Sequence, residues 1–239
     1  MTPAMTTATP SRRERLRAET IADIKDAARR LLVTGGPTAI SLRAIARDVG
    51  LTAPALYRYF DGLDALVLAI VSDLFEDLRT TVQDIAADHA GEEALTRIAH
   101  MARGFRRWAL AHPAEFALMF GSPVPGVTPF SGLCGPIVDA GARFGETFFA
   151  VLGEHYEHHP YVGEPHDLPD AALRELLRPY TETFGDRFPL PVVYLFVAAW
   201  TRLYGIVAME VFGHLAWATT DVEPLFEVEL ARTVRQLAR

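Results

Sequence analysis

The sequence has little cysteine, no uninterrupted membrane-length apolar run and no apolar leader. A single cysteine, Cys134, excludes an internal disulfide and leaves no thiolate pair for a zinc site. The N-terminal residues pass from small polar side chains directly to arginines, so we expect a cytoplasmic protein without a signal peptide. The most apolar segment, residues 190–209, is interrupted by Arg202, and we interpret it as a buried helix with no membrane partner.

Motifs of enzymes and of cofactor sites are also missing. The sequence has no glycine-rich phosphate loop, no Ser/His/Asp signature and no HExxH pair. These absences predict a protein that is not an enzyme and has no cofactor. Histidines and glutamates gather in residues 154–166, and imidazole with carboxylate suits zinc or nickel. Their spacing matches no closed metal site, so we predict a solvated loop there and no metal.

Positive charge is unevenly distributed along the chain. The formal net charge is −7, from 23 basic and 30 acidic residues. Residues 1–65 nevertheless hold ten basic and seven acidic side chains, against thirteen and twenty-three in residues 66–239. A basic N-terminal quarter on an acidic body indicates a face suited to a polyanion, although a solvated basic face would have the same balance.

The pattern that is present throughout is the helical period, without strand-like alternation. Apolar residues at helical spacing predict a first helix of about five turns that stops at Gly35-Gly36-Pro37. Two short helices and a long fourth helix from Gly62 are expected to follow. Later helices are expected near residues 95–108, 116–120, 133–155, 170–184 (broken at Pro179), 192–215 and 222–237. We therefore predict an all-α fold.

The two short helices carry the most informative motif. Ser41 is expected to cap the first, which ends at Gly50, and Thr52 the second, which extends to Tyr59 with Pro54 in its first turn. Two such helices joined by a tight glycine turn are the geometry of a helix-turn-helix, whose second helix enters the major groove of DNA. The residues expected to face bases or phosphates are Arg43, Ala53, Pro54, Tyr57, Arg58 and Tyr59.

The string SLRAIARDVGLTAPALYRYFDGLDAL, residues 41–66, closely resembles the DNA-binding domain of the TetR family of bacterial repressors. The resemblance covers about residues 17–66. It implies that the family's DNA-contacting positions are Arg43, Thr52, Ala53, Pro54, Tyr57 and Tyr59. The family places a phosphate-binding lysine where this chain has Leu63, next to the repulsive Asp61. Backbone N–H groups at that helix end can still hold a phosphate, so we expect weaker affinity and a shallower salt dependence.

Two later segments, HPAEFALMFGSPVPG (112–126) and WTRLYGIVAMEVFGH (200–214), resemble a TetR-like C-terminal domain of the WHG type. The resemblance implies an all-helical module that binds a small-molecule effector and forms a dimer. Independently, the last two helices are apolar on more than one face, which supports a homodimer through them. Aromatic and methionine side chains are candidates for the effector pocket, although residues at this spacing are usually core. They are Phe105, Trp108, Phe116, Met119, Phe120, Phe144, Phe148, Trp200 and Tyr204.

The expected organisation is a disordered basic arm over residues 1–16, a three-helix helix-turn-helix domain over 17–66, and a larger helical-bundle domain for ligand sensing and dimerisation over 67–239. The function that follows is sequence-specific DNA-binding regulation of transcription. The expected form is a repressor released from double-stranded operator DNA by a small-molecule effector, with an activator form left open. The alternative is a ligand-binding or catalytic all-helical protein whose helix-turn-helix is vestigial, which Leu63 and the acidic total charge allow.

Overall fold

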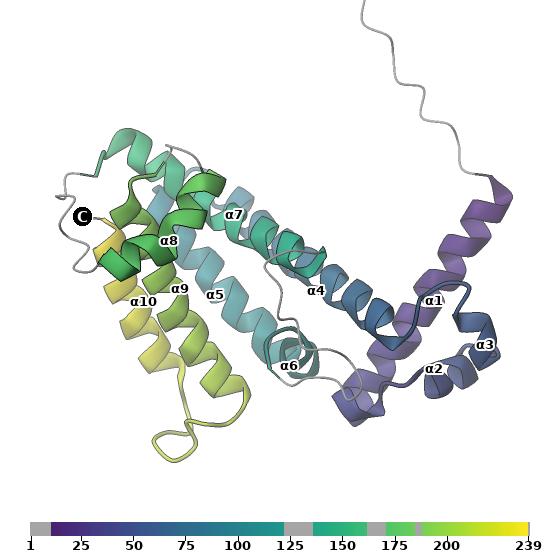
Figure 1. Cartoon of the computed structure of the whole chain (residues 1–239). Coiled ribbons are helices and arrows are strands. Elements are labelled where there is room, and N and C mark those ends of the chain that lie inside the picture. Colours follow the sequence, from purple (N-terminus) through teal and green to yellow (C-terminus); the bar gives the residue numbers. More distant parts are fainter. Residues whose placement is uncertain (1–10, 122–135, 162–170, 185–187, 239) are drawn as a thin grey trace, which may run out of the picture. The chain divides into compact units, whose positions relative to one another are not determined.

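The computed structural model describes residues 11–121, 136–161, 171–184 and 188–238, and every regular element in these ranges is a helix (Figure 1). In chain order the elements are α1 Arg12–Gly35, the 3-10 helix η1 Pro37–Ala39, α2 Leu42–Asp48, α3 Ala53–Leu56, α4 Leu63–Asp88, α5 Ala94–Ala111, α6 Pro113–Phe120, α7 Pro136–His158, α8 Ala171–Phe184, α9 Leu190–Val211 and α10 Glu223–Leu237. The predicted all-α class is confirmed. The helix near residue 170 differs from expectation because α8 continues through Pro179. A proline removes one backbone donor and can kink a helix without ending it.

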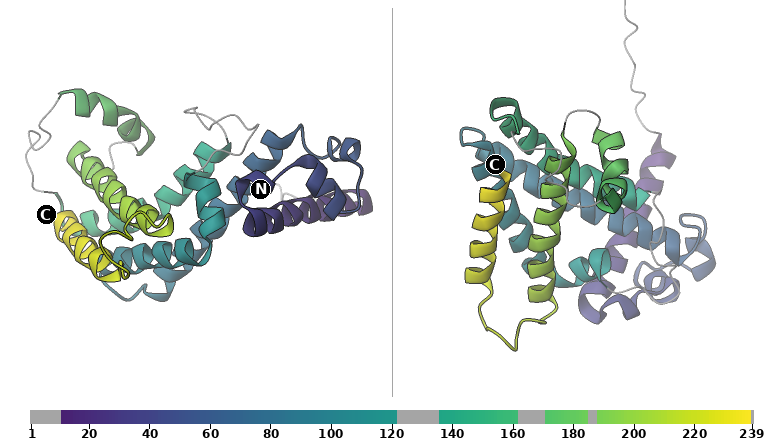
Figure 2. Two further views of the ribbon diagram at one scale, coloured as in Figure 1. Left: turned by 90° about the horizontal axis from the view of Figure 1, so that it is seen from below. Right: turned by 60° about the vertical axis from the view of Figure 1, so that its left-hand side comes forward.

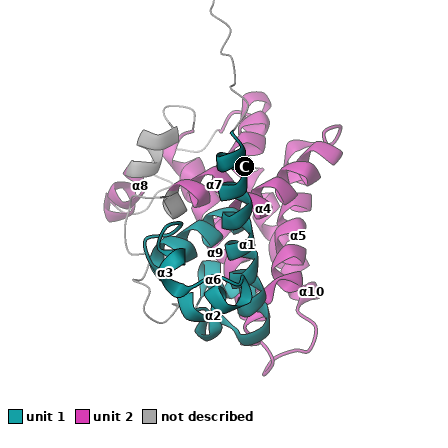
Figure 3. Ribbon diagram, turned by 90° about the vertical axis from the view of Figure 1, so that its right-hand side faces the viewer, with its two compact units in different colours: residues 1–74, 114–137 teal, residues 75–113, 138–239 magenta. Residues whose placement is uncertain are grey.

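The chain divides into two compact units (Figure 3). The first consists of Met1–Leu74 with Ala114–Ile137, and the second of Phe75–Pro113 with Val138–Arg239. The dividing point lies inside α4, beyond the boundary expected at residue 66. The first turns of α4 belong to the first unit, where the Nζ of Lys25 in α1 lies 2.7 Å from the carboxylate of Asp73 in α4.

The first helix begins earlier than the sequence pattern suggested. The Ser11 hydroxyl accepts the backbone N–H of Glu14 at 3.3 Å, and the Glu14 carboxylate accepts the backbone N–H of Ser11 at 2.7 Å. These two hydrogen bonds form a capping box that starts α1 and lowers the pKa of Glu14. The expectation of a disordered arm over 1–16 is therefore wrong for residues 12–16, and residues 1–10 lie outside the described ranges.

Within the second unit, α5 packs against α9 and α10, which lie side by side and are joined by a loop (Figure 2). Arg106 of α5 donates two hydrogen bonds to the Glu210 carboxylate of α9, at 2.7 and 2.8 Å. The hydrogen bonds to Glu210 are the main cause of a raised pKa for Arg106. The same guanidinium lies 3.5 Å from Glu223 and 5.4 Å from the centre of the Phe226 ring, both in α10. One arginine thus links three helices.

The long helix α9 is more exposed than predicted. Its most apolar 18-residue stretch has a mean hydropathy of 1.7, which makes α9 long and apolar enough to cross a membrane by length and composition alone. Only 22% of that stretch is buried within the chain. The interpretation as a buried helix is therefore wrong for most of its residues, which are half-buried in the single chain. Arg202 and Glu210 of α9 form ion pairs with neighbouring helices of the same unit, so the helix belongs to a packed bundle.

Candidate DNA-binding site and effector cavity

The helix-turn-helix is built by α2, a glycine turn and α3. The Ser41 hydroxyl accepts the backbone N–H of Ala44 at 3.2 Å, so Ser41 caps α2 as predicted. Gly50 has φ 68°, in the left-handed region that favours glycine, and this conformation turns the chain toward α3. The side chains of Ile45 and Leu56 are buried at the contact between the two helices. Burial on the inner side leaves the opposite faces of α2 and α3 outward.

The motif is held on a scaffold formed by α1. Ile24 and Leu32 are fully buried and supply the apolar contact of α1 with the rest of the unit. Arg30 of α1 also lies 2.6 Å from the carboxylate of Asp48 in α2. Both side chains of this pair are largely exposed, so it contributes at most about 1 kcal/mol to stability and acts mainly on geometry.

The outward surface of the motif carries the residues predicted to contact DNA. Tyr57 is 58% exposed. Tyr59 is half-buried, and the guanidinium of Arg17 in α1 lies 5.2 Å from the centre of its ring. The other predicted contacts are exposed at Arg43, Thr52, Pro54 and Arg58 and half-buried at Ala53.

The second helix of the motif is shorter than predicted. It ends at Leu56, and the following residues form turns in which the N–H of Arg58 bonds to Ala55 O at 3.2 Å and the N–H of Tyr59 to Leu56 O at 2.9 Å. Tyr57, Arg58 and Tyr59 therefore lie in turns and not on a helix. The Thr52 side chain makes no capping hydrogen bond, contrary to expectation, although the Thr52 carbonyl oxygen accepts the backbone N–H of Ala55 at 2.9 Å.

The N-terminus of α4 borders this surface in sequence and has no basic side chain in its first turn. α4 begins at the half-buried Leu63, after Gly62 with φ 100°. Asp64 is in the first turn, and Asp61 is exposed just before it. The helix end supplies backbone N–H groups, and its nearby side-chain charges are negative.

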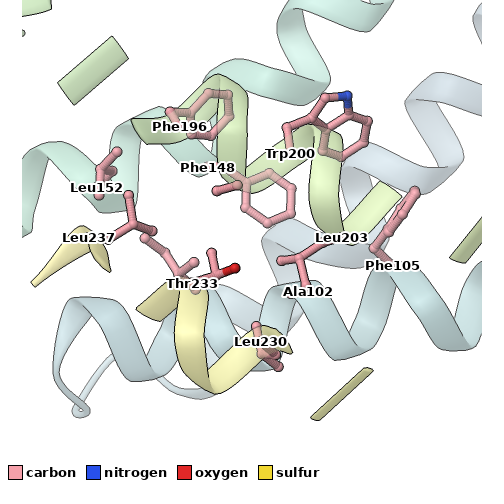
Figure 4. Close-up of a pocket in the computed structure, with 12 residues that line it drawn as sticks. Ala102, Phe105, Phe148, Leu152, Phe196, Trp200, Leu203, Leu230, Thr233 and Leu237 are labelled. Atoms are coloured by element: carbon pink, nitrogen blue, oxygen red, sulfur yellow. The ribbon is translucent and has the colours of Figure 1, made fainter. Parts of the chain in front are cut away.

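A cavity lies in the second unit between α5, α7, α9 and α10 (Figure 4). Its volume is about 540 Å³ when the space open to solvent is included. Among the described residues, none with a charged side chain lines it. The lining residues are Ile98, Ala102, Phe105, Phe148, Leu152, Phe196, Ala199, Trp200, Leu203, Leu230, Thr233 and Leu237.

Three of the nine predicted pocket residues, Phe105, Phe148 and Trp200, line this cavity. Phe144 lies behind them, with its ring centre 6.0 Å from that of Phe105 and 5.6 Å from that of Trp200. Tyr204 stacks on Trp200 at 5.7 Å. These two aromatic side chains support the lining residues.

The remaining predicted pocket residues lie elsewhere. Trp108 stacks on His112 at 4.9 Å between ring centres. Phe116, Met119 and Phe120 belong to α6, which the contacts assign to the first unit. Most lining residues that the sequence reasoning missed are aliphatic or small, from Ile98 to Leu237. Their spacing is that of ordinary core residues, so no sequence signal distinguishes them.

In the histidine-rich segment 154–166, where it is described, the rings of His158 and His159 bond to backbone carbonyls one turn back, while Glu154 pairs with Arg97 of α5. The ring Nδ1 of His158 lies 2.9 Å from Glu154 O, and that of His159 lies 3.2 Å from His155 O. His155 is buried, and this burial lowers its pKa, so its neutral form is favoured. His166 lies outside the described residues.

Over the described ranges, one group of three possible metal ligands converges, and it lies outside that segment, at His89, Glu92 and His100. The Glu92 carboxylate lies 2.8 Å from His89 Nδ1 and 3.2 Å from His100 Nε2, and the two imidazole rings stack at 3.8 Å. The hydrogen bond with His89 is the main cause of a lowered pKa for Glu92. This contact joins the turn after α4 to α5.

One unit holds a helix-turn-helix supported by α1, and the other is a helical bundle with an internal cavity. Together they define the class of a DNA-binding transcription regulator. The sequence matches the family model "Bacterial regulatory proteins, tetR family" over residues 24–70 and "Tetracyclin repressor-like, C-terminal domain" over residues 98–233. The chain belongs to the TetR family of bacterial transcription regulators.

Similar proteins agree with this assignment. The HTH-type transcriptional regulator Rv1816 of Mycobacterium tuberculosis is 29% identical over 233 residues, covering 95% of this chain and 96% of its own. The solved structure of the regulatory protein SCO4313 is 31% identical, with a TM-score of 0.67 and coverage of 94% of this chain and 98% of its own. A protein of unknown function from Rhodococcus sp. RHA1 has the same fold, with a TM-score of 0.65 at 22% identity, over 98% of this chain and all of its own.

Membership sets the general properties of the chain. TetR-family regulators bind operator DNA and small-molecule effectors and act as dimers, and effector-mediated repression is typical of them. The family is one of regulators and not of enzymes. It implies a soluble cytoplasmic protein, in which α9 is not a clear membrane span.

Proposed function

We propose that this chain is a homodimeric repressor that binds a pseudo-palindromic operator and is released when an effector enters the cavity of its second unit. The observation that carries the proposal is the contrast within the helix-turn-helix. Ile45 and Leu56 are buried behind it, while Tyr57 and its neighbours are exposed in front of it. A large exposed aromatic side chain on a rigid frame is typical of a surface that contacts another molecule.

The chemistry of the exposed surface favours DNA. Tyr57 and Thr52 have hydroxyl groups that can bond phosphate oxygens, and Arg43 and Arg58 supply positive charge. Arg17 of α1 lies over Tyr59, so the basic start of α1 adjoins the same surface. Arginine and hydroxyl groups placed together in this way suit contacts with DNA phosphates, which position the protein on the duplex whatever the base sequence. Contacts with the bases would come from the outer face of the motif.

Exposed apolar side chains on α9 and α10 support a dimer through these helices. Most residues in the apolar stretch of α9 are only half-buried in the single chain. Met209 of α9 is 39% exposed, and Leu225 and Val228 of α10 are 41% and 51% exposed. Small residues on α9, such as Gly205, would allow a partner helix to approach closely. A second copy related by a twofold axis would bury these side chains and present two recognition motifs to two half-sites.

The first test of DNA binding uses an operator selected from a random duplex library by the purified protein. Fluorescence anisotropy then compares the wild type with Tyr57→Ala and Tyr57→Phe. We expect Tyr57→Ala to raise Kd for the operator by about tenfold, equivalent to about 1.4 kcal/mol, because a ring contact and a hydrogen bond are lost. Tyr57→Phe should raise Kd less, because it loses only the hydrogen bond of the hydroxyl group and keeps the ring contact.

The control for this test is Val33→Ala, which truncates an exposed apolar side chain of α1 that is 59% exposed. It should leave Kd unchanged. A selection that returns no consensus sequence, or a Tyr57→Ala variant that binds as tightly as the wild type, would contradict the proposed interface. Turnover of a bound metabolite without any DNA affinity would instead support the alternative of a vestigial helix-turn-helix.

The substitution Leu63→Lys is expected to strengthen DNA binding. A lysine at the start of α4 adds a positive charge beside the backbone N–H groups that can hold a phosphate. One added phosphate contact should steepen the slope of log K against log salt by about 0.9 and tighten binding at low salt. Anisotropy across a salt series measures both effects. The control Leu63→Gln should leave the slope unchanged, and an equal slope in Leu63→Lys would show that no phosphate lies at this helix end.

A further inference from the structure

The cavity contains a buried hydroxyl group that lacks a hydrogen-bond partner. Thr233 of α10 is 2% exposed, and its Oγ1 has no partner among the described residues. Figure 4 shows this oxygen directed into the space between α5, α9 and α10, while the indole nitrogen of Trp200 points away from that space. Thr233 is therefore the lining residue that can give a ligand a side-chain hydroxyl, once neighbouring side chains move to uncover its buried oxygen.

Other helical threonines of this chain behave differently. Thr147 donates to Arg143 O at 3.2 Å, and Thr201 donates to Val197 O at 2.8 Å, one helical turn back in each case. Such a bond is the usual way for a helical threonine to satisfy its hydroxyl group. A buried hydroxyl without any partner costs about 1–3 kcal/mol, so a ligand that pairs with Thr233 would recover part of that free energy.

We infer that the effector is a largely apolar, uncharged molecule with one hydrogen-bonding group, a hydroxyl or a carbonyl, that pairs with Thr233. This inference rests on the proposal that the cavity is the effector site. The lining side chains other than Thr233 are aromatic and aliphatic, and they suit a hydrocarbon or aromatic body.

Charge on the ligand is disfavoured by the same lining. A carboxylate or ammonium group would lose its hydration on entry and find no charged side chain among the lining residues. The guanidinium of Arg106 on α5 is already paired with Glu210. A neutral hydroxyl or carbonyl loses less hydration, and the threonine hydroxyl can donate to either or accept from a hydroxyl.

The test uses three probes that differ at one chain end: butylbenzene, 4-phenyl-1-butanol and 4-phenylbutanoate. Their affinities are measured by displacement of the neutral fluorophore N-phenyl-1-naphthylamine from the full-length protein. The variants are Thr233→Val, which keeps the shape and removes the hydroxyl group, and Thr233→Ser, which keeps the hydroxyl group. Thr201→Val, on an exposed position of α9, is the matched control.

We expect the ratio of alcohol affinity to hydrocarbon affinity to fall about three- to tenfold in Thr233→Val, the range of one net hydrogen bond. The ratio should be retained in Thr233→Ser and in Thr201→Val, and 4-phenylbutanoate should bind weakest to the wild type. Thr233→Val should melt no lower than the wild type, because it removes an unpaired buried hydroxyl group.

Each other outcome overturns the inference in an identifiable way. An unchanged ratio in Thr233→Val would show that Thr233 does not anchor the ligand. Tightest binding of 4-phenylbutanoate would show that the site takes an anion. Failure of all three probes to bind, with operator binding intact, would reject the cavity as an apolar site and leave the DNA-binding part of the proposed function standing. If the wild type binds no operator but shows the expected order of probe affinities, only the DNA-binding part of the proposed function is rejected.

Discussion

Arginine in place of Val228 is expected to leave monomers in solution and to raise Kd for the operator by about 100-fold or more, the range in which linked binding events are lost. Val228 is 51% exposed on α10, on the part of the bundle proposed to pair with a second copy. A guanidinium buried at that contact without a partner is strongly unfavourable. A monomer then binds one half-site at a time. Sedimentation velocity measures the mass, and anisotropy measures operator binding.

The control for this prediction is Leu110→Arg, which places the same charge on a 40% exposed apolar position of α5. It should remain dimeric and bind the operator like the wild type. A Val228→Arg protein that sediments as a dimer would contradict the proposed α9–α10 interface. A monomeric wild type at micromolar concentration would reject the homodimer itself.

Removal of Arg106 from the Arg106–Glu210 pair is expected to lower the free energy of unfolding by about 3 kcal/mol, since Glu210 then remains buried without its partner. Removal of Glu210 should cost less, because Arg106 keeps Glu223 at 3.5 Å. The side chains are 12% and 13% exposed and joined by two hydrogen bonds. The double variant Arg106→Met/Glu210→Met should recover much of the loss, because it leaves no unpaired charge. Urea unfolding measures the free energy of unfolding of the wild type, the two single variants and the double variant. All four are compared at the same protomer concentration, because dimerisation makes stability depend on concentration.

The matched control is Arg103→Met on the same helix. Arg103 also forms two hydrogen bonds with a glutamate, Glu227 of α10, at 2.7 and 2.8 Å, and these lower the pKa of Glu227. Its side chain is 37% exposed, so water can replace the partner and the loss should stay below about 1 kcal/mol. Equal losses for Arg103→Met and Arg106→Met would show that burial does not decide the strength of these pairs.

The sequence determined the local part of this protein. Helical period, the Ser41 cap and the left-handed Gly50 were sufficient to locate the helix-turn-helix, because each depends on neighbours within a few residues. The same local signals were less reliable at the ends of elements. The capping box at Ser11 starts α1 earlier than the basic composition suggested, and α3 stops at Leu56.

Only the tertiary structure decided which side chains surround the cavity and which face of α9 stays open. Phe105 and Phe144 have similar sequence signals, yet one lines the cavity and the other lies behind it. Thr233 had no signal at all, because an unpaired hydroxyl group is defined by what α5, α7 and α9 place around it. Helix periodicity indicates that a face is apolar. Packing between segments distant in sequence determines whether that face contacts the core, a ligand or a second copy of the chain.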